Sequence, residues 1–127
     1  MAHKAYGIYA HITWHTRLRA RCIRLADARH VVEGVRDAAR RLDVHVHEVA
    51  VLTDHVHVVA SFRPDRPVAP FVRHGKSESA RRINLDRGRV FQWARGYYVQ
   101  SLSRTHVGPA CAYVAAQYKR HPDRIPS

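Results

Sequence analysis

The fold is decided by residues 53–62, which read Thr-Asp-His-Val-His-Val-Val-Ala-Ser-Phe. This apolar, β-branched run is typical of a β-strand, in which successive side chains point to opposite faces of the sheet. His55 and His57 therefore stand side by side on one face and form a pair of imidazole ligands. Two ligands hold a metal ion poorly, so other elements must bring further ligands to this face.

A second strand is predicted directly before this one, over residues 44–52. Only two residues separate the strands, which favours a tight antiparallel hairpin that pairs Ala50 with His57. His45 and His47 form another His-x-His pair. In this register they lie on the opposite face and about 10 Å further along the strands, so we do not expect them to share a metal ion with the first pair.

The rest of the chain alternates between strands and helices. Residues 6–16 predict an opening strand, and Asp27 is expected to cap a helix whose apolar positions recur up to Leu42. A second helix is predicted from about 68 to 85, a further strand over 96–102, and a last helix from Gly108-Pro109 to before residue 122.

The composition points to a polyanionic partner. The chain has 127 residues, enough for one domain (1–127), with 22 Lys and Arg against 10 Asp and Glu and a formal net charge of +12. An anionic membrane surface is the rival partner, but the basic residues are spread over the chain rather than set on one amphipathic helix. We expect no membrane association and a cytoplasmic location, because no signal-like or membrane-spanning apolar segment is present.

Basic and aromatic residues indicate where a nucleic acid binds. The predicted DNA-binding residues lie on the second helix and in the loop after it: Arg73, Lys76, Arg81, Arg82 and Arg95. Trp93 and Tyr98 are either base-stacking rings or core residues. The connection over residues 17–24 carries four arginines, for which phosphate contact and simple solvation are both open.

The last helix completes a chemical constellation. Tyr113 and Gln117 are four residues apart and share one helical face. Two imidazoles, from His55 and His57, and the amide oxygen of Gln117 make a three-ligand site at which a divalent cation can polarise a phosphodiester. Tyr113 is then the nucleophile, and its phosphotyrosine keeps the bond energy for a later rejoining step.

These residues resemble a known family. Asp54-His55-Val56-His57 looks like the His-hydrophobic-His (HUH) motif of the single-tyrosine transposases of the insertion sequence 200/605 family, which includes domesticated repeat-associated relatives, and Tyr113-Val-Ala-Ala-Gln117 looks like their tyrosine helix. The likeness extends to the strand over 9–14, the helix over 71–83 and residues 96–99.

The resemblance implies a fold, an activity and partners. The fold would be α+β, a ferredoxin-like or RRM-like antiparallel sheet with helices on one face and a C-terminal tyrosine-bearing helix. The protein would be a homodimer that cleaves and rejoins single-stranded DNA with hairpin ends, using Mg²⁺ or Mn²⁺ at His55, His57 and Gln117. Tyr113 would join the 5′-phosphate. Roughly eight residues before Pro109 let the last helix reach a partner, and the resemblance favours exchanged helices.

Two other functions remain open. A catalytically inactive, RRM-like nucleic-acid-binding protein would share the charge and the aromatic residues, but it leaves the four constellation residues unexplained. A zinc hydrolase would need a carboxylate base near the histidines. Asp54 is expected to point to the other face, and Glu48 is at best a candidate for supporting a ligand.

Overall fold

A computed structural model describes residues 7–88 and 90–127. Its strands form a four-stranded antiparallel sheet in the spatial order β2-β3-β1-β4. The strands are β1 (Ile8–His15), β2 (His45–Val51), β3 (His55–Phe62) and β4 (Tyr98–Leu102). The predicted strands are confirmed, although the last begins two residues later than expected.

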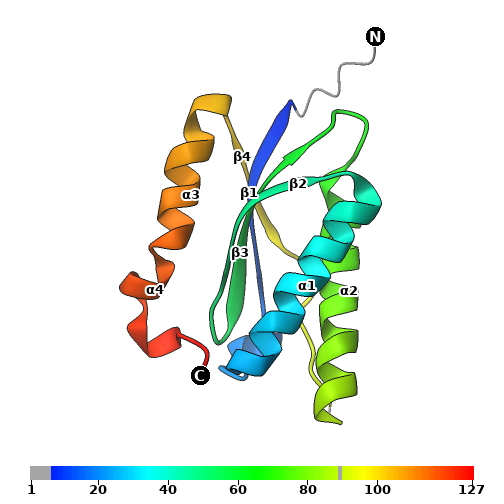
Figure 1. The fold of residues 1–127 in the computed structure, drawn as a ribbon, viewed down its shortest axis with the longest axis vertical. Coiled ribbons are helices and arrows are strands. Elements are labelled where there is room, and N and C mark those ends of the chain that lie inside the picture. Colours follow the sequence, from blue (N-terminus) through cyan, green and yellow to red (C-terminus); the bar gives the residue numbers. More distant parts are fainter. Residues whose placement is uncertain (1–6, 89) are drawn as a thin grey trace.

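Helices cover both faces of the sheet. Helices α1 (Leu25–Leu42) and α2 (Val68–Arg87) pack side by side on one face, and α3 (Val107–Ala115) and α4 (Gln117–Arg120) lie on the other (Figure 1). The element order β1-α1-β2-β3-α2-β4 with this strand arrangement is the ferredoxin-like topology. The predicted α+β class, with its additional C-terminal helix, is confirmed.

The two helical layers bury cores of unequal size. The larger core lies under α1 and α2 and includes Ile12, Trp14 and Phe62. The smaller core lies under α3 and has only Ala50, Val59 and Val114 as fully buried members. Because both faces are covered, every residue of β3 is buried, including its histidines. This central strand places the histidine pair on the α3 face.

Helix α2 packs very closely against α1. The buried stripe of α2 is Phe71, Val72, Gly75, Ser79 and Ile83. At Ser79 this stripe meets Gly34 of α1, where an added Cβ would lie 2.8 Å from the backbone nitrogen of Ser79. The Ser79 hydroxyl accepts a hydrogen bond from the indole N–H of Trp93 (3.0 Å), whose ring packs edge-on against Trp14. Trp93 is therefore a core residue, whereas Tyr98 is 76% exposed.

Asp27 does not cap α1 as predicted. The N-cap is Arg24, and Asp27 lies inside the first turn, where its carboxylate accepts a hydrogen bond from the backbone N–H of Arg24 (2.8 Å). The same carboxylate is 3.2 Å from the guanidinium of Arg87, and both side chains are buried. The carboxylate thus holds the helix start and also joins α1 to the end of α2.

The β2–β3 hairpin has the expected pairing at its turn but a bulge further on. Ala50 pairs with His57 as predicted, whereas the register shifts between Val46 and Glu48. His45 consequently faces Ser61, on the same face as the histidine pair, so the predicted opposite face is wrong. Ser61 is four residues from His57, about 13 Å along the strand, and the two His-x-His pairs remain apart as predicted.

Candidate metal and tyrosine site

His55 and His57 converge on one point. Both are 8% exposed, their rings are inclined at 74°, and their Nε2 atoms are 3.1 Å apart. Two neighbouring ligands of an octahedral ion, each about 2.1 Å from it, are about 3 Å apart. The separation of the two nitrogens therefore fits a shared divalent cation.

Asp54 orients His55. The Oδ1 of Asp54 is 2.6 Å from the Nδ1 of His55, and Asp54 is only 4% exposed. Because a carboxylate only accepts, the Nδ1 of His55 carries the proton and its Nε2 keeps a lone pair. Burial opposes ionisation here, but the hydrogen bond and charge of His55 outweigh it and lower the pKa of Asp54. The expectation that Asp54 points to the other face is wrong.

His57 is supported from the neighbouring strand β1. Its Nδ1 is 2.9 Å from Nε2 of His11 and 3.3 Å from the hydroxyl oxygen of Thr13. Burial, followed by the charges of His55, His11 and other nearby histidines, lowers the pKa of His57 to about 3. His57 is therefore a neutral imidazole at physiological pH, as a metal ligand must be.

Tyr113 lies beside the histidines. Helix α3 packs on β2 and β3 of its own chain, and the ring of Tyr113 stands edge-on to those of His57 (6.2 Å between centroids) and His11 (5.9 Å). The guanidinium of Arg120 lies over the same ring, 5.0 Å from its centroid. Tyr113 is 43% exposed, so a large substrate can reach the phenol that borders the buried imidazoles.

Gln117 is almost wholly buried, with 1% of its surface exposed. The predicted continuous helix is interrupted at Ala116, which separates α3 from α4, but Gln117 still donates its amide N–H to the carbonyl of Tyr113 (3.3 Å). Its side-chain oxygen is left to accept another partner. The hydroxyl of the neighbouring Tyr118 accepts the backbone N–H of Val51 (3.0 Å), so this second phenol is held elsewhere.

The C-terminal segment ties the tyrosine helix to the β2–β3 turn. The backbone N–H of Thr53 donates to the carbonyl of Arg124 (2.9 Å), and the guanidinium of Arg124 lies 4.0 Å from the carboxylate of Asp54. The last residue, Ser127, accepts the backbone N–H of Leu25 (3.1 Å). The segment after α4 thus holds both the turn before β3 and the start of α1.

The predicted DNA-binding residues of α2 lie on the opposite face of the sheet from the histidines (Figure 1). Three of them are engaged within the protein. Arg81 and Arg82 both bind Glu78, Arg82 also binds Glu33 (2.6 Å), and Lys76 donates to the carbonyls of Ala94 (2.7 Å) and Gly96 (2.9 Å). Within the described ranges, Arg73 and Arg95 are exposed and show no ion pair.

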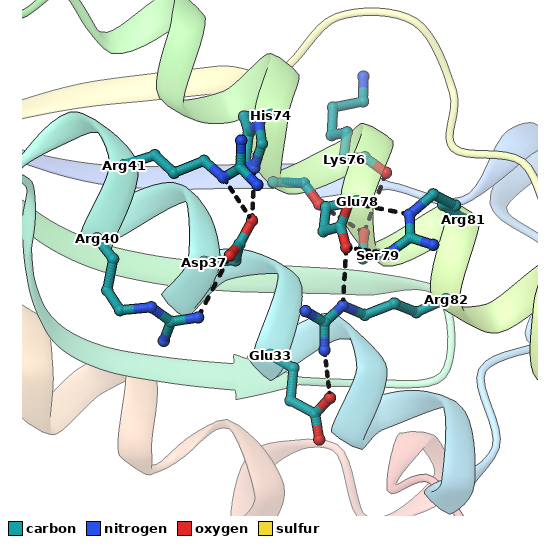
Figure 2. Close-up of polar contacts among 11 residues, drawn as sticks. Glu33, Asp37, Arg40, Arg41, His74, Lys76, Glu78, Ser79, Arg81 and Arg82 are labelled. Carbon is teal, nitrogen blue, oxygen red and sulfur yellow. Dashed lines mark hydrogen bonds and ion pairs between the residues drawn. The ribbon is translucent and has the colours of Figure 1, made fainter.

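A second group of ligand-type residues lies between α1 and α2 (Figure 2). Ligand atoms of Asp37, His74 and Glu78 all lie within 4.8 Å of one another and by distance alone can hold a metal ion. The charges here are already compensated, however. Glu78 binds two arginines, whose hydrogen bonds lower its pKa to about 2, and Asp37 binds His74 (2.7 Å) and two more arginines. This group acts as an ion-pair network that clamps the helices.

Sequence reasoning found the two histidines but missed the residues that support them: Asp54, His11, Thr13, Arg120 and Arg124. The sequence contained one indication of these supporting residues, because alternation along the first strand puts His11 and Thr13 on one face. This indication could be used only with the strand order, which places β1 next to β3.

Known proteins resemble this chain in sequence and in fold. The sequence model of the family described as Transposase IS200 like matches residues 4–117. No curated protein matches the chain. Within the described residues, no helix has both the length and the apolar character needed to cross a membrane.

Two solved structures have a similar fold. A protein of Deinococcus radiodurans R1, assigned as a transposase, has a TM-score of 0.71 at 22% identity, over 92% of this chain and 95% of that chain. A REP-associated tyrosine transposase bound to a REP hairpin has a TM-score of 0.74 at 13% identity, over 95% of this chain and 72% of that chain.

Proposed function

The chain belongs to the IS200-like transposase family, and from this premise we propose that it cuts and rejoins single-stranded DNA through a covalent bond to Tyr113. The observation that carries the proposal is the convergence of His55 and His57, with 3.1 Å between their Nε2 atoms and the Tyr113 ring at the edge of His57. An inactive binding protein has no use for this arrangement.

The proposed reaction is a transesterification. The phenol oxygen of Tyr113 attacks the phosphorus, the bond from phosphorus to the 3′-oxygen breaks, and the proton lost by the phenol is balanced by the proton that the 3′-oxygen gains. The 5′-phosphate stays on Tyr113, and attack by a 3′-hydroxyl reverses the step. Arg120 lies over the tyrosine ring, and its positive charge would attract the DNA phosphate to the phenol.

The metal ligands we propose are His55, His57 and Gln117, with Mg²⁺ or Mn²⁺ as the ion. The fit rests on the two converging Nε2 atoms and on the Gln117 side-chain oxygen, which its own amide hydrogen bond leaves available. When bound, the ion polarises the phosphodiester. Three neutral ligands do not offset a double charge, so binding is weak until DNA phosphate completes the shell.

We propose that the DNA substrate has hairpin ends. One structural neighbour is bound to such a structure, a REP hairpin. Arg73 and Arg95 are the exposed cations best suited to phosphate. Lys76, Arg81 and Arg82 add positive charge on α2, the helix that also carries Arg73. The reaction would take place in the cytoplasm.

We further propose a homodimer with exchanged tyrosine helices. The link from β4 to α3 is residues 103–106, shorter than the sequence predicted, and α3 packs on its own sheet in the single chain. An exchanged helix would make these same contacts with the sheet of a partner, which is how domain swapping preserves a fold.

The test is a covalent adduct. The protein is incubated with single-stranded oligonucleotides and Mn²⁺, then denatured, and the adduct is mapped by mass spectrometry. We expect the DNA on Tyr113, and we expect Tyr113→Phe to retain DNA binding while forming no adduct. Tyr118→Phe is the matched control and should still form it. Attachment at another tyrosine, or no adduct with any single strand, would refute the proposal.

A further inference from the structure

An exposed apolar residue stands on a basic turn next to the histidine pair. Residues 17–19 form a short 3-10 turn directly after β1, and Leu18 at its centre is 89% exposed. Its neighbours Arg17 and Arg19 are also exposed. Leu18 is not packed in either core, so core packing does not explain a leucine in this position.

The turn is held in a disfavoured backbone conformation. Leu18 and Arg19 both have positive φ angles, 57° and 53°. L-residues other than glycine and asparagine seldom adopt this conformation, and two in succession are rarer still. Such residues persist only where the surroundings fix them, and they cluster at functional sites.

Thr16 fixes the base of the turn. Its side chain is 1% exposed, and its hydroxyl oxygen lies 2.7 Å from the carbonyl oxygen of Ala20 and 3.2 Å from that of Asp54. Its backbone N–H also donates to the carbonyl of Asp54 (2.8 Å). The turn is thereby attached to the residue that orients His55.

The turn is also close to the histidine pair itself. His15, two residues before the turn, stacks its ring on His55 with 5.5 Å between centroids. Arg19 lies on the exposed turn, four residues after His15 in the chain. Nucleotides next to a phosphate at His55 and His57 would therefore meet this turn.

A hollow adjoins the leucine. It has a volume of about 440 Å³ and is lined by Arg17, Leu18, Phe91 and Gln92, among others. Phe91 and Gln92 border the hollow with an aromatic ring and an amide. Arg17 donates a hydrogen bond to the side-chain oxygen of Gln92 (3.0 Å). This volume is in the range of pockets that hold small aromatic ligands.

We propose that Leu18 is a wedge that inserts between two bases where the duplex stem of a hairpin meets its single strand. Arg17 and Arg19 bind the flanking phosphates, and the unstacked base enters the adjoining hollow. Apolar side chains flanked by arginines open base steps in this way in other DNA-binding proteins. The inference rests on the proposed function, because it requires a hairpin substrate beside the histidine pair.

The experiment uses a hairpin oligonucleotide with a single-stranded extension and 2-aminopurine at the first unpaired nucleotide, without added metal so that the DNA is not cut. We expect the fluorescence of the 2-aminopurine to rise when the full-length protein binds. Leu18→Ala should remove the rise and weaken binding by about tenfold, as expected when the apolar surface of one inserted side chain is no longer buried. Leu85→Ala, which shortens an exposed leucine of α2, should change neither.

Leu18→Gly separates the side chain from the turn. Glycine accepts positive φ, so this variant should unfold in urea no earlier than the wild type and still lose the fluorescence rise. Leu18 variants that match the wild type in both readouts, while the wild type binds and forms its Tyr113 adduct, would overturn the wedge alone. A wild type that neither binds DNA nor forms an adduct would overturn the proposed function with it.

Discussion

At the scale of single residues, the site depends on where protons lie on two imidazoles. The carboxylate of Asp54 accepts a hydrogen bond from the Nδ1 of His55 (2.6 Å), which leaves the Nε2 of His55 directed toward His57. His57 has its own partners on β1, so each ring is oriented from behind by a different element. A ligand pair of this kind is prepared before a metal ion arrives.

We therefore expect Asp54→Asn to weaken Mn²⁺ binding by about tenfold and Asp54→Ala by up to about 100-fold, because a lost orienting partner lets the His55 ring turn or change tautomer. The measurement is the free Mn²⁺ signal in electron paramagnetic resonance during a titration. Asp86→Asn, on α2, is the matched control. Unchanged Mn²⁺ affinity in a folded Asp54 variant would contradict this role.

The sequence could predict this site only in part. His55 and His57 were accessible because alternation along a strand fixes which residues share a face. Asp54 was not, since it lies in the turn, where alternation does not apply and where its carboxylate bends back to the neighbouring ring. His11 also required the strand order, which depends on long-range pairing of β1 with β3.

At the scale of elements, close packing of α1 and α2 depends on a glycine. A Cβ on Gly34 would come within 2.8–3.0 Å of the backbone nitrogen, Cα and Cβ of Ser79, so one helix would have to shift. The ion pairs between the two helices, His74 with Asp37 and Arg82 with Glu33, would shift with it. The geometry of the larger core follows from this contact.

Gly34→Ala should lower the free energy of unfolding by about 1–3 kcal/mol, the usual effect of overpacking a close helix contact. Gly75→Ala, on the facing helix, is the matched control. An added Cβ there meets its nearest neighbour at 3.8 Å, so its stability should be unchanged or slightly higher. Urea unfolding of the two variants checks the difference, and equal stabilities would show that the helices move apart at little cost.

Helix periodicity predicted which faces are buried but not where the elements become irregular. Both irregularities coincide with tertiary contacts: the imidazole of His47, at the bulge, bonds the hydroxyl of Ser61, and Gln117, next to the interruption at Ala116, is buried. These contacts join residues far apart in the sequence or depend on packing. Local patterns carry no record of them.

At the scale of the whole molecule, the sheet separates two surfaces. The histidine pair and Tyr113 lie on the α3 face, while Arg73 and the other basic residues of α2 lie on the opposite face (Figure 1). A DNA molecule that contacts both must pass around an edge of the sheet, or meet the two surfaces on different subunits of a dimer.

A mixed dimer tests the proposed exchange of helices. One subunit carries His55→Ala and His57→Ala, the other Tyr113→Phe and Gln117→Ala, and each should be inactive alone. With exchanged helices, one of the two composite sites keeps all four residues, so adduct formation by the purified heterodimer should return to about half of the wild-type level. A verified heterodimer that stays inactive would show that each subunit uses its own helix.

The unequal sizes of the two cores affect how often each helical layer opens from the sheet. Among the described residues, only three apolar side chains (Ala50, Val59 and Val114) are fully buried in the core under the helix that carries Tyr113, whereas the sheet and its other two helices share the larger core. Segments with little buried apolar surface open locally far more often than the whole protein unfolds. The tyrosine helix can thus open from an intact sheet on a timescale of its own, and in the proposed reaction the rate of this opening would limit how often a cut strand is transferred.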